Sequence, residues 1–226
     1  MVIFFMDLCA RLCSVEETLC AEHYQKNLSF RLPVSASGYL EEQGQLGAFF
    51  YGEQRKILGR WLLHGAPLNA AVNACEVMAV FNVCHYFGEE PSFPELLSYF
   101  ERSGCSLYGY FGTSLAAVEH FFVEKGYEIE VYQKSGLEGL YSCPKKEKEA
   151  YLLTGYNVKG RLKEMIHTIC VTKERDDFWA HNDYEGSRHS ASLAGAAKGY
   201  HQGKGEMIYA IRILGKIHNK TADAVF

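Results

Sequence analysis

The spacing of hydrophobic residues predicts three consecutive helices in the middle of the chain. Between residues 74 and 87 apolar side chains recur every three or four positions, and Gly88 then supplies a helix stop. Ser92 and Glu95 form a capping box that opens a second helix, which runs to about residue 104. Thr113 or Ser114 can cap a third helix that ends near residue 126.

From Tyr127 onward the pattern changes to the two-residue period of half-buried strands. Tyr127, Ile129 and Val131 alternate with more polar neighbours, which predicts a first strand. A short helix or a turn is expected at 192–200. Further strands are predicted at 151–156, 165–171, 178–182 and 207–214. Helices followed by an antiparallel sheet indicate an α+β fold.

The first 60 residues carry weaker patterns, with helices predicted over 15–25 and 54–63. We expect residues 1–60 to form an N-terminal extension and residues 61–226 to form the principal domain. A chain of 226 residues with 48% hydrophobic residues can bury a substantial core.

Charge and composition argue against nucleic acid and anionic membranes as binding partners. The formal net charge of −4 and the isoelectric point near 6.1 give no basic excess for nucleic acid or an anionic membrane, so a peptide or small-molecule substrate fits better. No stretch approaches the ~18 apolar residues of a membrane span. The N-terminus lacks the basic region and cleavage site of a signal peptide.

Eight cysteines are present, without the spacing of a zinc ribbon or a disulfide-rich secreted domain. Cys9, Cys13 and Cys20 have no fourth ligand with zinc-like spacing, so no metal or cofactor is expected. Reduced thiols in the cytoplasm are the simpler interpretation.

Cys75 is the cysteine whose position suggests chemistry. It stands in the first turn of the helix predicted over 74–87, where backbone N–H groups and the helix dipole favour a thiolate. A thiolate nucleophile needs a base that later protonates the leaving group, and histidine suits both roles. His167 interrupts an otherwise apolar strand pattern and is our candidate.

A predicted hairpin supplies the third residue. If residues 165–182 fold about the midpoint of Glu174 and Arg175, the numbers of facing residues sum to 349, which sets His167 opposite Asn182. Asn182 is therefore expected to orient the imidazole. A register slip of one residue would exchange it for Asp183, which remains the alternative orienting residue.

Three residues near Cys75 in sequence bear on the same chemistry. Asn69 and Asn73 precede it, and Asn69 is the better candidate for an oxyanion-hole donor, whereas Asn73 is expected to cap the helix. Glu76 follows it and would oppose thiolate formation unless its side chain points into solvent. The segment 109–114 is either part of a substrate cleft or a plain interhelical loop.

In size and motif order, residues 64–214 resemble the papain-like cysteine peptidases, most closely the bacterial peptidases that cut leader peptides after a double glycine. In that superfamily an amide residue lies six positions before the cysteine, the cysteine begins the central helix, and His then Asn or Asp follow on the sheet. Asn69, Cys75, His167 and Asn182 match this order. The chain departs from the usual Gln and Asp-Cys-Gly of the leader peptidases, since Asn69 and Ala74-Cys75-Glu76 stand there.

The resemblance implies a papain-like fold and a thiol-dependent hydrolase that cleaves peptide or amide bonds through a Cys-His-Asn triad. Two alternatives stay open. A related acyltransferase, similar to transglutaminases or phytochelatin synthases, would use the same groups with another acceptor. A binding protein that keeps the fold without activity is the other, because Glu76 and Asn69 are unusual at their positions.

Overall fold

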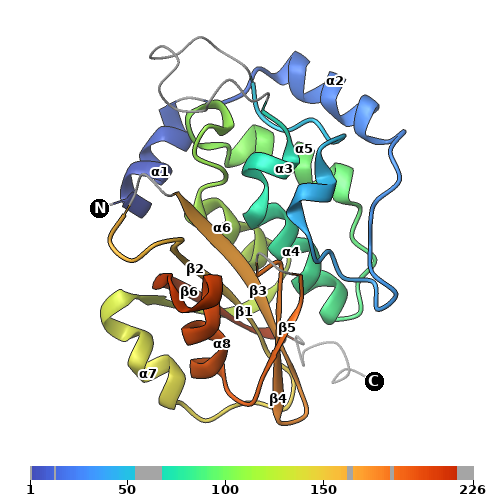
Figure 1. Ribbon diagram of the computed structural model, residues 1–226. Coiled ribbons are helices and arrows are strands. Elements are labelled where there is room, and N and C mark those ends of the chain that lie inside the picture. The colour runs from blue at the N-terminus through green and yellow to red at the C-terminus, as the bar shows by residue number, and fades with distance from the viewer. Residues whose placement is uncertain (1, 13, 54–67, 162–164, 184–185, 218–226) are drawn as a thin grey trace, which may run out of the picture.

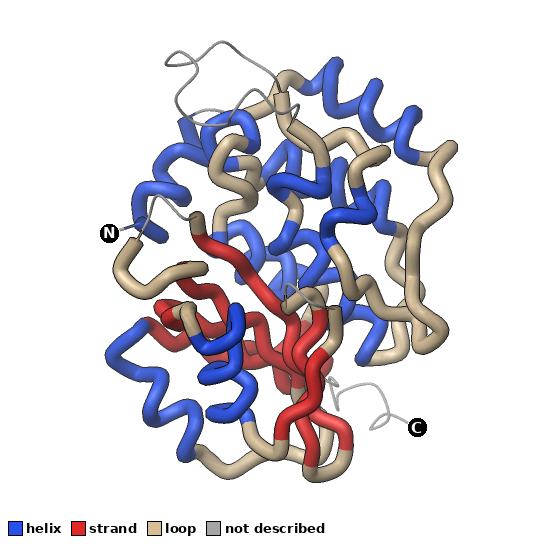
Figure 2. The backbone as a smooth tube through the Cα atoms, in the orientation of Figure 1, coloured by secondary structure: helices blue, strands red, loops and turns tan. Residues whose placement is uncertain are grey.

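The computed structural model describes residues 2–12, 14–53, 68–161, 165–183 and 186–217. The helix predicted over 54–63 and the residue Cys13 lie outside this part of the chain. The α-helices are α1 (Val2–Leu12), α2 (Glu17–Asn27), α3 (Ala70–Asn73), α4 (Cys75–Tyr86), α5 (Phe93–Ser103), α6 (Leu115–Glu124), α7 (Leu137–Ser142) and α8 (Leu193–Gly199). Figures 1 and 2 show these helices arranged around a sheet.

The strands form one antiparallel sheet in the order β1-β6-β2-β3-β4-β5. They are β1 (Tyr127–Gln133), β2 (Ala150–Tyr156), β3 (Ile166–Glu174), β4 (Asp177–His181), β5 (Arg188–Ser190) and β6 (Glu206–Lys216). The combination of helices with an antiparallel sheet agrees with the α+β class expected from the sequence.

The three predicted helices in the middle of the chain are confirmed as α4, α5 and α6. Their starts follow from local hydrogen bonds: Ser92 Oγ accepts the Glu95 N–H at 3.4 Å, and Ser114 Oγ accepts the Ala117 N–H at 3.3 Å. Each bond satisfies a backbone N–H that has no partner within its own helix. The short helix predicted at 192–200 is confirmed as α8.

The register of the β3–β4 hairpin differs from the prediction. Glu174 pairs with Asp177 and Cys170 with His181, so facing numbers sum to 351 and the loop consists of Arg175 and Asp176. Arg175 adopts a left-handed backbone with φ of 57°, which lets β3 continue to Glu174 before the chain reverses. The pairing ends at His181, and the prediction that His167 faces Asn182 across the hairpin is therefore wrong.

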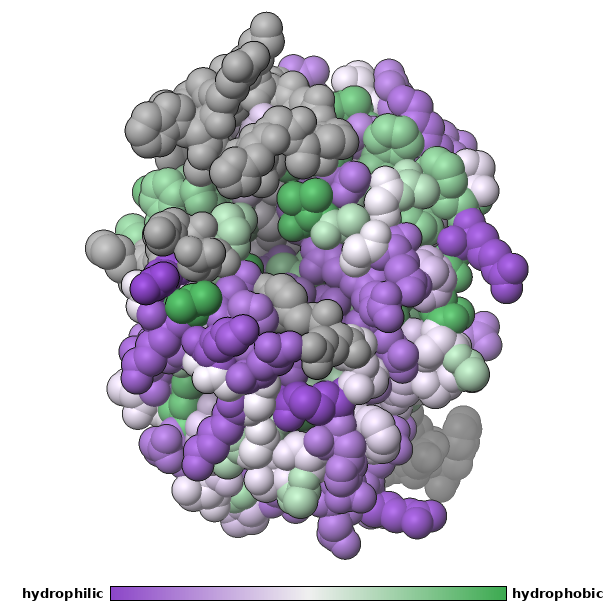
Figure 3. Space-filling view, in the orientation of Figure 1, coloured by the Kyte–Doolittle hydropathy of each residue, from purple (hydrophilic) through white to green (hydrophobic). Residues whose placement is uncertain are grey.

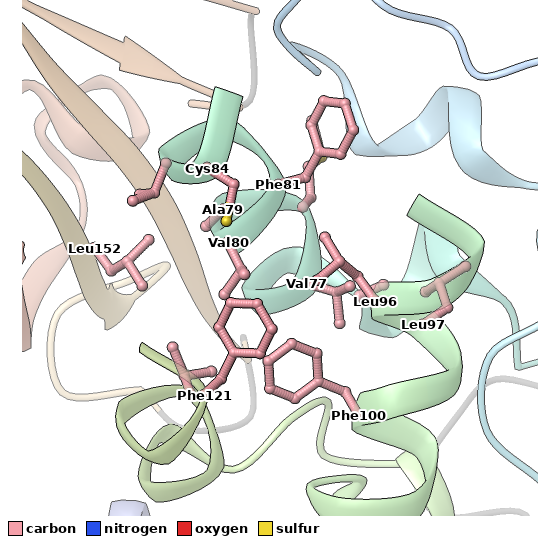
Figure 4. Packing of buried hydrophobic residues seen from close by; sticks show 14 of the residues in the cluster. Val77, Ala79, Val80, Phe81, Cys84, Leu96, Leu97, Phe100, Phe121 and Leu152 are labelled. Atoms are coloured by element: carbon pink, nitrogen blue, oxygen red, sulfur yellow. The ribbon is translucent and has the colours of Figure 1, made fainter. Parts of the chain in front are cut away.

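The sheet separates two hydrophobic clusters, because alternate residues of each strand point to opposite faces. On one face α4 packs against Leu152 of β2 and Cys170 of β3, together with residues of α5 and α6 (Figure 4). On the other face α7 and α8 cover Ile169 and Val171 of β3 (Figure 1). Even-numbered residues of β3 thus face α4, and odd-numbered ones face α8.

Residues before 54 contribute to the same core as α4. Leu40, Phe49 and Tyr51 are buried in its hydrophobic cluster. Asp7 of α1 accepts hydrogen bonds from the Ser114 hydroxyl at 2.5 Å and from the Ala116 N–H at 3.3 Å, which places its carboxylate at the N-terminal end of α6. Among the helices of the described ranges, none is long and apolar enough to cross a membrane.

Candidate active site

Cys75 is the first residue of α4, and Ala74 joins it to the single turn of α3. The thiol is largely buried, with 7% of the residue exposed. It lies on the wall of a pocket at the N-terminal end of α4. The other residues lining this pocket are Val72, Asn73, Glu76, Tyr110, Phe111, Gly112, Met165 and Ile166.

Most of this lining is apolar, and Val72 and Met165 at its margin are partly exposed to solvent. The aromatic residues come from the segment 109–114, of which Tyr110, Phe111 and Gly112 line the pocket, and the role of this segment in a substrate cleft stays a prediction. On the face seen in Figure 3, hydrophobic residues gather mainly over the helical half, and the half with α7 and α8 is largely hydrophilic. The pocket wall beside the Cys75 thiol is therefore mostly apolar.

Two backbone N–H groups and one carboxylate act on the Cys75 thiol. The N–H groups of Thr168 and Glu76 act to lower its pKa, whereas the Glu76 carboxylate acts to raise it. Burial and the Glu76 charge hold the pKa of Cys75 well above its usual value. The sequence argument for a lowered thiol pKa is therefore wrong, because desolvation and a neighbouring carboxylate outweigh the helix N-terminus.

Glu76 points into the protein instead of into solvent. Its carboxylate accepts the Thr113 N–H at 3.3 Å and the Thr168 hydroxyl at 3.2 Å, and the residue is 1% exposed. Burial raises the pKa of this carboxyl group, while these hydrogen bonds act in the opposite direction. The residue that follows Cys75 in sequence thus lines the same pocket.

His167 lies near the start of β3, and its side chain lies on the α8 face of the sheet. Its ring stacks on Tyr200 with 6.4 Å between centroids, and its Nε2 lies 2.7 Å from the backbone oxygen of Asn182. A carbonyl oxygen only accepts, so Nε2 carries the hydrogen and a neutral ring has Nδ1 as its acceptor. Burial lowers the pKa of His167, which favours this neutral form.

Asn182 meets His167 through its main chain and not through its amide. The chain turns after β4 with Asn182 in a left-handed conformation at φ 64°, which directs its carbonyl at the ring. The Asn182 Oδ1 instead accepts the Gln43 N–H at 3.0 Å, and its Nδ2 is buried without a described partner. The expected contact with His167 therefore exists, but the side chain does not make it.

Asp183, the alternative orienting residue, has its two carboxylate oxygens engaged elsewhere. One accepts from Arg188 Nε at 2.8 Å and the other from the His201 N–H at 2.9 Å. Its negative charge acts to raise the pKa of His167, but no hydrogen bond between Asp183 and the His167 ring occurs among the described contacts.

The two asparagines before Cys75 differ from their expected roles in different ways. Asn73 does not cap a helix: its Nδ2 donates to the carbonyl oxygens of Tyr51 at 3.2 Å and Gly109 at 2.9 Å. Asn73 thereby connects the segment 109–114 to Tyr51. Asn69 precedes α3, and its Oδ1 is buried without a hydrogen-bond partner. It is not among the residues that line the pocket.

The structure brings Cys75, Glu76 and Thr168 together and groups His167 separately with Asn182 and Tyr200. The two groups adjoin, because the Thr168 N–H at the Cys75 sulfur belongs to the peptide bond that follows His167. In the described part of the chain, no hydrogen bond joins the Cys75 thiol to the His167 ring.

Sequence reasoning missed two contributors to this site. Thr168 alternates with His167 on β3 and so faces α4, and a buried threonine between apolar strand residues was the available signal. Gln43 was not detectable, because it begins a single 3₁₀ turn (Gln43–Leu46) that is too short to show a periodic pattern. Its N–H reaches Asn182 and its Nε2 donates to the Ala70 oxygen at 3.1 Å, which links the two halves of the site.

No family model matches the chain, and no curated protein matches it. Among solved structures, the chain is similar to the peptidase domain of Streptococcus ComA, a bifunctional ABC transporter involved in a quorum-sensing pathway. The two share 12% sequence identity with a TM-score of 0.41, and the match covers 64% of this chain and 93% of that one.

Proposed function

We propose that the protein is a papain-like, thiol-dependent hydrolase that cleaves peptide or amide bonds through an acyl-enzyme on Cys75. The observation that carries the proposal is the setting of this thiol. It begins a buried helix, lies on the wall of an apolar pocket, and has the backbone N–H groups of Thr168 and Glu76 acting to lower its pKa. Such donors stabilise the negative charge that develops when the thiol loses its proton.

His167 is the proposed base and acid, and Asn182 its proposed orienting residue. The bond from Nε2 to the Asn182 carbonyl supports this assignment, since it selects the tautomer whose Nδ1 can accept a proton. Catalysis by this pair requires the ring to turn from Tyr200 towards the thiol. Asn69 and the Cys75 N–H are the proposed oxyanion donors, and a cytoplasmic location would keep the thiols reduced.

The test is acylation by an activated ester with an apolar acyl group, such as p-nitrophenyl butyrate. We expect a burst of p-nitrophenol and a thioester on Cys75 detected by mass spectrometry, with Cys75→Ser abolishing both. His167→Ala should slow turnover of the ester by about 10²–10⁴-fold, the usual contribution of a general base. Cys143→Ser is the matched control, because Cys143 is partly exposed and lies outside the pocket.

Two outcomes would contradict parts of the proposal. Transfer of the acyl group to an added amine in preference to water would indicate an acyltransferase. Failure of Cys75 to react would favour a binding protein without activity, a candidate that the raised pKa of Cys75 also supports.

A further inference from the structure

The carboxylate of Glu76 is the charged side chain that acts on the Cys75 thiol. Both residues line the same pocket and each acts on the pKa of the other, whereas the His167 ring is hydrogen-bonded to Asn182 on the other side of β3. Two donors, the Thr113 N–H and the Thr168 hydroxyl, hold the carboxylate in place. Glu76 is therefore a proton acceptor already positioned at the thiol.

The surroundings of this pair allow one negative charge but not two. The pocket residues nearest to it are apolar or neutral, and none of the described residues that line the pocket is a lysine or an arginine. A thiolate beside a carboxylate in such a site is unfavourable, since like charges repel strongly where solvent is excluded. The pair therefore retains one proton over a wide pH range, and its two groups titrate together.

The other titratable groups around Glu76 are neutral near pH 7. The Tyr51 hydroxyl is hydrogen-bonded to the Thr113 hydroxyl at 2.6 Å. The Glu76 charge contributes to raising the pKa of Cys105. Burial raises the pKa of both well above the usual values. From β3 the neighbouring groups are Thr168 and the neutral His167. Cys75 is thus the only described group facing Glu76 that can exchange a proton with it during attack.

We propose that Cys75 and Glu76 share one proton and that Glu76 takes it when Cys75 attacks. The S–H bond breaks, an O–H bond forms on Glu76, and the sulfur electron pair bonds to the substrate carbonyl carbon as charge moves to the carbonyl oxygen. On collapse the C–N bond breaks, and the proton passes from Glu76 to the leaving nitrogen. The products are a Cys75 thioester and an amine. In this scheme Glu76 takes the place of His167 as base and acid of the acylation step, and His167 keeps the role of base for the water that hydrolyses the thioester.

This inference rests on the proposed nucleophilic role of Cys75, but its test needs no substrate. The test is the pH dependence of Cys75 alkylation by iodoacetamide in the full chain, followed by mass spectrometry. While the pair holds one proton, its thiolate fraction does not depend on pH. We expect the wild-type rate to rise, stay flat through neutral pH, and rise again in alkali. In Glu76→Gln we expect a rise of about tenfold per pH unit without the flat region.

Two further variants separate this role from a structural one. Thr168→Val removes one donor from the carboxylate, which raises its pKa, so the flat region should begin at higher pH. Glu119→Gln is the matched control, because that carboxylate bonds Tyr209 and lies outside the pocket, and its profile should match the wild type.

Three results would overturn the inference: parallel profiles in the wild type and Glu76→Gln, faster alkylation of Glu76→Gln at every pH, or no alkylation of Cys75 at any pH. The second would mean that Glu76 only repels the thiolate. A flat wild-type region without ester acylation would support the shared proton and reject the proposed hydrolase. Ester acylation without a flat region would support the hydrolase and reject the shared proton.

Discussion

The position of Asn182 allows a direct test of how the imidazole is held. Its carbonyl oxygen binds His167 Nε2 at 2.7 Å, and its side chain binds the Gln43 N–H at 3.0 Å. Asn182→Ala removes the second interaction and leaves the first, because every residue has a carbonyl group. The variant should therefore lose stability without losing the tautomer of His167.

The magnitude follows from two terms. Loss of the hydrogen bond to Gln43 costs about 1 kcal/mol. Alanine at a φ of 64° costs about 1 kcal/mol more, since asparagine tolerates the left-handed region better than alanine does. We expect the free energy of unfolding to fall by about 2 kcal/mol in total.

Urea denaturation measures the stability change, and long-range ¹H–¹⁵N correlation spectra of the folded protein report which ring nitrogen of His167 carries the proton. We expect hydrogen on Nε2 in the wild type and in Asn182→Ala, and acylation rates within about threefold of each other. A change of tautomer in the folded variant, or a rate lower by about 10²-fold or more, would refute the reasoning, because it would show that the side chain orients the ring.

Two further predictions concern stability. Burial and the His85 charge lower the pKa of His181 to about 4, so the unfolded chain takes up a proton more readily, and stability should fall by about 3 kcal/mol between pH 7 and pH 4. In His181→Asn this loss should be absent from urea titrations at the two pH values, and an equal loss in both proteins would contradict the assignment. Arg212→Met should cost about 3–5 kcal/mol by leaving the buried Glu149 unpaired. Glu130→Gln, at the more exposed partner of Arg212, should cost less than about 1 kcal/mol, and similar losses in both variants would contradict the difference.

Local patterns predicted the elements that depend on neighbouring residues. The helices α4, α5 and α6 follow from apolar periodicity and from the caps at Ser92 and Ser114, which act within one turn. The strand β1 follows from simple alternation. In contrast, β5 was not predicted, because three residues carry too short a pattern.

The register of the hairpin could not be predicted in the same way. A loop of two residues with Arg175 in the left-handed region shifts every facing pair by two relative to the expected sum. Arginine is not a residue that favours this conformation, so no signal in the sequence marks the turn. The packing of α7 and α8 on one face and α4 on the other stabilises the observed register.

The sequence by itself determined that Cys75 begins a helix and that His167 lies on a strand, since both follow from periodicity. Only the tertiary structure decided what surrounds the thiol. The contacts of the buried Glu76 carboxylate with Thr113 and Thr168 join residues 37 and 92 positions apart. The contact of the Asn182 carbonyl with His167 depends on how the chain turns after β4. Burial then sets the pKa of Cys75, because desolvation depends on the whole fold and not on neighbours in sequence.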